Sequence, residues 1–223
     1  MGRNAGGVLS GVMLSEGGRS SRKSRGKSSE GSSDSGGSSG TKGATEKGYT
    51  AKMVKNIVGV EQRYRRKKDE TAHIFTRNGN LVTSVRGIGT DIDFQGRKIP
   101  PNSIITHNHP RALSESGIER IGNSFSRKDI LTAVDFNAAE IRAVTPTYTF
   151  SVKRPKGGWG ASVNEIGKAY DEIYRVVYRS GEDYLRKTGT DESHRARANV
   201  TFYHKVMKIL AKKYSWDYSK KNK

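Results

Sequence analysis

The chain has 223 residues and carries 41 lysines and arginines against 22 aspartates and glutamates, which gives a formal net charge of +19. It contains no cysteine, and this excludes thiol proteases, cysteine-bearing zinc fingers and disulfide-stabilised folds. No apolar run has the length of a signal peptide or of a transmembrane helix, so we expect a soluble cytoplasmic protein with no membrane partner.

The first 50 residues differ in composition from the rest of the chain. They hold 13 of the 26 glycines together with 12 serines, and their few apolar residues do not cluster. Such a segment cannot bury enough apolar surface to offset the entropy that is lost on ordering. We therefore expect residues 1–50 to form a disordered Gly/Ser-rich basic tail, which leaves about 170 residues for a core.

A β-hairpin is predicted after the tail. The stretch 71–76 leads into Asn78-Gly79, and a second run with strand character covers residues 81–85. An Asn-Gly pair between two such runs is a strong signal for a tight hairpin turn. Glu70 therefore stands at the opening of a core strand.

A His-x-His-Pro sequence follows the next predicted strand. The β-branched run 104–106 is typical of a strand, and Pro110 ends it because proline lacks a backbone donor. Side chains two residues apart on an extended chain leave the same face. His107 and His109 can therefore bind one ion, while Asn108 points away.

A helix is predicted to begin just after Ser126. Ser126-x-x-Asp129 has the form of a capping box, and apolar residues at helical spacing follow it. Two imidazoles and a carboxylate are a ligand set of catalytic zinc sites, in which a fourth position stays open for water. Each motif also has a purely structural interpretation, as an ordinary helix cap and as a solvated strand end.

The remainder of the chain predicts two short strands and then a pair of antiparallel helices. Gly189 and Asp191 suit a helix C-cap followed by an N-cap, so the two helices should form a hairpin whose aromatic stripe packs in the core. His73 is expected in a strand, and His194 and His204 on helices. The elements predicted here are the strands 140–144 and 148–153 and the helices 163–185 and 196–214.

These motifs together resemble the JAB/MPN (JAMM) zinc metalloprotease family, most closely its phage-associated and RadC-type stand-alone domains. The resemblance covers about residues 55–155. It implies an α/β fold with a mixed β-sheet flanked by helices, and zinc bound by His107, His109 and Asp129. The segments that carry it are 107–110, 124–130 and 140–144.

The same resemblance implies a hydrolase of peptide or isopeptide bonds. Its members use an upstream glutamate as general base, and Ser126 would help to stabilise the oxyanion. Two glutamates are eligible as the base. We favour Glu70, at the start of a core strand, over Glu61, which lies in an apparent helix among arginines where we expect a surface ion pair.

The domain division expected from these features is a tail (1–50), a JAB-like metalloprotease domain (51–158) and a C-terminal helical hairpin packed on the core (159–223). The stretch 111–123 is longer than the corresponding loop of most family members. It would serve as a lid or a specificity element, or else be a passive surface insertion.

Two classes of function follow from the sequence. The first is a zinc-dependent peptidase or isopeptidase that acts on protein or peptide substrates such as ubiquitin-like conjugates, in a host cytoplasm or a virion if phage-encoded. The alternative is a non-catalytic JAB-fold protein, either a virion component or a non-specific nucleic-acid binder. Basic clusters at 63–68 and 208–223 favour weak, salt-sensitive attraction to nucleic acid. A nuclease has little support, because the residues around the histidines do not fit the ββα-metal motif.

Overall fold

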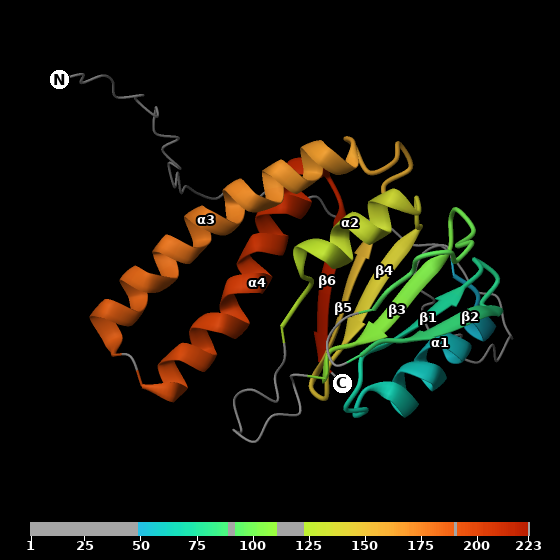
Figure 1. Cartoon of the computed structure of the whole chain (residues 1–223), viewed down its shortest axis with the longest axis horizontal. Coiled ribbons are helices and arrows are strands. Elements are labelled where there is room, and N and C mark those ends of the chain that lie inside the picture. Colours follow the sequence, from blue (N-terminus) through green and yellow to red (C-terminus); the bar gives the residue numbers. More distant parts are fainter. Residues whose placement is uncertain (1–48, 89–91, 111–122, 190, 223) are drawn as a thin grey trace, which may run out of the picture. The chain divides into compact units, whose positions relative to one another are not determined.

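The structure is a computed structural model that describes residues 49–88, 92–110, 123–189 and 191–222 (Figure 1). The predicted basic tail, except for its last two residues, lies outside the described residues. The same is true of most of the predicted loop 111–123, of which only Asn123 is described.

A six-stranded mixed sheet forms the centre of the described chain, in the order β2-β1-β3-β4-β5-β6 (Figure 1). Strands β3 and β4 are parallel, and every other neighbouring pair is antiparallel. The strands are β1 (Thr71–Phe75), β2 (Leu81–Arg86), β3 (Ile104–Asn108), β4 (Glu140–Val144), β5 (Tyr148–Lys153) and β6 (Asp217–Asn222).

Four helices of the described residues cover the two faces of this sheet. α1 lies on one face, and α2, α3 and α4 lie on the other (Figure 1). Among the described residues, no helix is both long and apolar enough to cross a membrane. The helices are α1 (Ala51–Tyr64), α2 (Arg127–Asp135), α3 (Val163–Thr188) and α4 (Glu192–Tyr214).

The local signals in the sequence correctly locate most of these elements. The hairpin between β1 and β2 forms at Gly79, whose φ of 79° is a conformation that favours glycine. α3 ends at Gly189 with φ of 122°, and Asp191 caps α4 by accepting a hydrogen bond from the His194 backbone. The prediction of a mixed α/β fold with a C-terminal helical hairpin is confirmed at this level.

Strand β6 was not predicted, and the interpretation of residues 159–223 as only a helical hairpin is wrong in this respect. α4 ends where Ser215 adopts a left-handed conformation with φ of 57°, and the chain returns to pair with β5. The strand's sequence, Asp-Tyr-Ser-Lys-Lys-Asn, is almost wholly polar because β6 is an edge strand with little buried surface. It therefore lacks the apolar alternation that marks the other strands.

The two faces of the sheet differ in chemistry. Side chains that point toward α2, α3 and α4 are mainly apolar and join those helices in one buried cluster. Side chains that point toward α1 include several buried polar groups, and successive residues of a strand alternate between these faces. On β3, Thr106 faces α1, whereas Ile105 and His107 face α2.

Candidate metal centre

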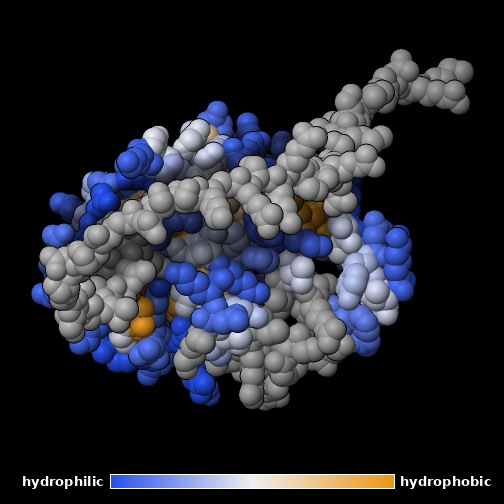
Figure 2. Space-filling model, turned by 180° about the vertical axis from the view of Figure 1, so that it is seen from behind, coloured by the Kyte–Doolittle hydropathy of each residue, from blue (hydrophilic) through white to orange (hydrophobic). Residues whose placement is uncertain are grey.

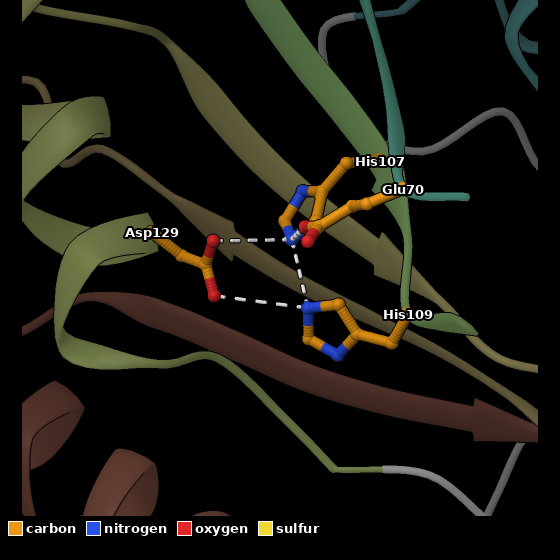
Figure 3. Close-up of side chains that lie close together, drawn as sticks. All are labelled: Glu70, His107, His109 and Asp129. Carbon is orange, nitrogen blue, oxygen red and sulfur yellow. Dashed lines mark hydrogen bonds and ion pairs between the residues drawn. The ribbon is translucent and has the colours of Figure 1, made fainter. Parts of the chain in front are cut away.

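The strands bring the first three polar groups of the site together. His107 lies directly opposite Ala72 in the antiparallel pairing of β1 with β3. Glu70, two residues before Ala72, extends from the start of β1 on the same face of the sheet (Figure 3). His109 follows β3 on that face as well, so the i, i+2 spacing places both imidazoles beside one another as predicted.

Asp129 reaches the same point from the first turn of α2 (Figure 3). The Nε2 atoms of His107 and His109 are 2.9 Å apart. His107 Nε2 lies 3.2 Å from Asp129 Oδ1, and His109 Nε2 lies 3.7 Å from Asp129 Oδ2. Ligand atoms of these three residues and of Glu70 all lie within 4.8 Å of one another, so this cluster could hold a metal ion.

The distances between the donor atoms fit a small tetrahedral cation. Zinc binds nitrogen and oxygen at ~2.0–2.1 Å, which puts neighbouring ligand atoms about 3.3 Å apart. The separations of 2.9, 3.2 and 3.7 Å among the two imidazoles and Asp129 bracket that value. Glu70 Oε1 is 3.8 Å from His107 Nε2. The carboxylate of Glu70 therefore lies beside the three potential ligands.

A backbone carbonyl orients His109. Its Nδ1 lies 2.9 Å from the carbonyl oxygen of Asn123, which can only accept a hydrogen bond. Nδ1 therefore carries the proton, and in the neutral ring the lone pair of Nε2 points toward His107 and Asp129. Metal-binding histidines commonly have their second nitrogen held in this way.

Ser126 and Asp129 form the predicted capping box at the start of α2. The Ser126 hydroxyl accepts a hydrogen bond from the Asp129 backbone at 3.2 Å. Asp129 Oδ2 in turn accepts from the Ser126 backbone at 2.7 Å and from the Ser126 hydroxyl at 2.8 Å. These bonds occupy Oδ2 and turn Oδ1 toward His107. The observed contacts of Ser126 thus orient a potential ligand.

The charges of the cluster stabilise one another. Burial opposes ionisation of Asp129, but the neighbouring His107 and His109 outweigh it and hold the pKa of this carboxyl well below its usual range. Burial likewise opposes protonation of His109, yet the hydrogen bond and charge of Asp129 raise the pKa of the imidazole. Protonation of His109 and ionisation of Asp129 therefore favour one another.

A cavity of about 250 Å³ opens beside these residues. One part of its wall is the polar cluster, with Ser126 and Lys128 nearby. The other part is largely apolar, because Ile105 and Ile141 form the floor on neighbouring strands. Its remaining apolar and aromatic lining comes from Ile92, Phe94, Pro110 and Tyr203.

Glu61, the second predicted base, lies on the opposite face of the sheet. It accepts hydrogen bonds from Arg142 at 2.6 and 3.1 Å and from Thr106 at 2.9 Å. Only 3% of Glu61 is exposed, so the expected surface ion pair is in fact buried. The sequence did not reveal this because Arg142 lies 81 residues away on β4.

The basic cluster 63–68 exposes fewer basic side chains than its sequence indicates. Arg65 is buried, and it donates hydrogen bonds to the Thr145 carbonyl at 2.7 Å and the Thr149 hydroxyl at 3.0 Å. Lys220 of the second cluster lies 3.8 Å from the centre of the Tyr148 ring. The face seen in Figure 2 is mainly hydrophilic among the described residues, with small separate apolar areas.

Two further residues support the candidate centre in ways that the sequence did not indicate. Asn108 is fully buried and points away from the histidines, as predicted. Its side chain accepts from the Thr71 backbone at 2.8 Å and donates to the carbonyls of Lys67 and Asp69 at 3.2 and 3.1 Å. The three hydrogen bonds therefore hold the backbone on both sides of Glu70. The other residue, Asn123, acts through its backbone, which leaves no signal in the sequence.

Comparisons of the chain with protein-family models, with curated proteins and with solved structures find no match.

Proposed function

We propose that this protein is a zinc-dependent hydrolase of peptide or isopeptide bonds, of the JAB/MPN type. The observation that carries the proposal is the convergence of His107, His109 and Asp129 at separations that suit a tetrahedral cation, with the Glu70 carboxylate beside them. Three protein ligands and one open position are the arrangement of catalytic rather than structural zinc.

In this proposal each residue has a defined role. His107 and His109 offer neutral imidazole nitrogens, and Asp129 offers Oδ1. A zinc ion held by them would acidify a water molecule and polarise the carbonyl of the scissile bond. Glu70 would take the proton from that water and return it to the leaving amine, as a buried carboxylate next to the reacting groups can do. The Ser126 hydroxyl lines the same cavity and is our candidate for stabilising the oxyanion, to which it would donate the proton that it gives to Asp129 Oδ2 in this structure.

The cavity favours a particular kind of substrate. Its apolar part continues directly from the polar cluster, since Ile105 precedes His107 by two residues on the same face of β3. A peptide whose reacting carbonyl lies at the cluster would place a neighbouring side chain against Ile105 and Ile141. We therefore propose substrates with an aliphatic or aromatic residue next to the scissile bond.

The decisive test compares the zinc-loaded wild type with Glu70→Gln on a panel of peptides and isopeptide-linked conjugates. The variant should retain zinc and lose at least about 100-fold in kcat, because the general base is gone while the ligands remain. Asp135→Asn is the matched control, since this exposed carboxylate lies at the end of α2. Full activity of Glu70→Gln would show that another group is the base.

A DNA-binding measurement made beside the hydrolysis assay addresses the non-catalytic alternative. A wild-type protein that binds zinc, hydrolyses no member of the panel and binds duplex DNA with strongly salt-dependent affinity would favour a nucleic-acid binder. The net charge of +19 is the observation that supports this second function.

A further inference from the structure

The short segment Asn123–Ser126 carries contacts to two of the three potential metal ligands. Its first residue presents the carbonyl that holds His109 Nδ1. Its last residue caps α2 and binds the Asp129 carboxylate. Any displacement of this segment would therefore turn one imidazole and shift one carboxylate. What holds the segment in place decides the geometry of the metal centre.

Tyr218 of β6 binds the segment at its second residue. The Tyr218 hydroxyl lies 2.9 Å from Ser124 Oγ, and Ser124 is almost fully buried. The same hydroxyl lies 2.8 Å from His204 Nδ1 on α4. Because a phenol has one proton, it can donate to one of these partners and accept from the other. Burial raises the pKa of Tyr218 to about 12, so the phenol keeps its proton near neutral pH.

Tyr170 of α3 holds the next residue of the segment. Its hydroxyl donates to the Phe125 carbonyl at 3.2 Å, and both side chains are buried in the main core cluster. The segment thus has one anchor from β6 and one from α3, on either side of the bond between Ser124 and Phe125. The anchor from β6 is the closer one in sequence to the Asn123 carbonyl.

We infer that Tyr218 is a positioning residue of the metal centre: its hydroxyl, through Ser124, fixes the Asn123 carbonyl that sets the orientation and tautomer of His109. The inference rests on the proposed zinc site and adds to it a residue from the far end of the chain. It also gives a role to β6, which completes the sheet and delivers the hydroxyl to the segment.

The test uses zinc affinity, measured with the full-length protein by competition against a chromophoric chelator. Tyr218→Phe removes only the hydroxyl and should weaken zinc binding about 10-fold, the lower end of the range for groups that orient a ligand. Tyr214→Phe is the matched control, because this ring stacks on Trp216 and no described hydrogen bond joins it to residues 123–126. It should bind zinc like the wild type, and the affinities are compared at a temperature where every variant is folded without metal.

A double-mutant cycle with Ser124→Ala tests the path of the effect. If Tyr218 acts through Ser124, the double variant should bind zinc no more weakly than the worse single variant. Unchanged affinity in Tyr218→Phe, or full additivity in the cycle, would overturn the inference and leave the zinc hydrolase proposal standing. Wild-type protein that binds no zinc would overturn both. Weaker binding by Tyr218→Phe in a protein without hydrolytic activity would support the inference and reject the hydrolase.

Discussion

Arg142 on β4 and Glu61 on α1 form a buried, two-pronged ion pair, with Nε to Oε1 and Nη2 to Oε2 distances of 2.6 and 3.1 Å. Burial opposes the charge on Arg142, but Glu61 and then Glu140 outweigh it and raise the pKa of the guanidinium. Glu140 is completely buried and also accepts hydrogen bonds from Ser151 and Tyr49. The face of the sheet opposite the candidate metal centre is therefore held by a network of buried charges and hydrogen bonds.

Removal of Glu61 should therefore destabilise the fold and leave the candidate metal centre unchanged. We expect Glu61→Ala to lower the free energy of unfolding by about 3–5 kcal/mol, because it leaves a buried guanidinium without its main partner. Urea denaturation measures this change, and zinc affinity should stay at the wild-type value. Arg86→Ala breaks the exposed pair with Asp69 and should cost far less. Loss of zinc binding in Glu61→Ala at a temperature where it is folded would contradict the separation of the two faces.

Asn108 should link stability to the placement of the proposed base. Asn108→Ala removes three hydrogen bonds and leaves the Thr71 backbone donor without this partner. We expect a loss of roughly 3 kcal/mol in the free energy of unfolding. Zinc affinity should change little because the ligands face the other side, while hydrolysis should fall as Glu70 loses its support. Asn56→Ala, which removes one part-buried hydrogen bond from an exposed side chain to Gly79, is the control and should change the free energy of unfolding far less.

His73 should make the protein less stable in mild acid. Burial, assisted by the charge of Arg63, lowers the pKa of His73 to about 4 from an ordinary value of 6.5. The unfolded chain therefore binds a proton that the folded protein excludes, and stability falls as the pH drops from 6.5 toward 4. At about pH 5 this group should account for roughly 2 kcal/mol of lost stability. The measurement compares urea midpoints of wild type and His73→Asn at two pH values, with a chelator present. Parallel pH dependence in the two proteins would refute this assignment.

Zinc should bind the wild type at about one ion per chain and stabilise it. At a free zinc concentration 100 times the Kd, mass action adds about 2.7 kcal/mol to the free energy of unfolding. A His107→Ala, His109→Ala double variant should show neither bound metal nor this stabilisation, by elemental analysis and thermal denaturation. His194→Ala changes a histidine paired with Asp191 away from the cluster and should behave as the wild type. Equal metal content in wild type and double variant would reject the site.

Local patterns in the sequence determined the elements of the site. The alternation of side chains along a strand put His107 and His109 on one face, and the Ser126-Asp129 spacing marked the start of a helix. Both patterns depend on the geometry of a few consecutive residues, which the chain adopts whatever its surroundings. The strands β4 and β5 were likewise predicted from the sequence, because each carries its own apolar and β-branched residues.

Only the tertiary structure decided which distant residues meet. The buried partner of Glu61, the support that Asn108 gives to the Glu70 segment and the contact of Tyr218 with Ser124 each join residues at least 37 positions apart. Polar strand β6 forms because β5 offers an open edge to pair with, and its own sequence does not require it. Strand pairing and helix packing set these contacts, and such long-range pairings leave no periodic trace in the sequence.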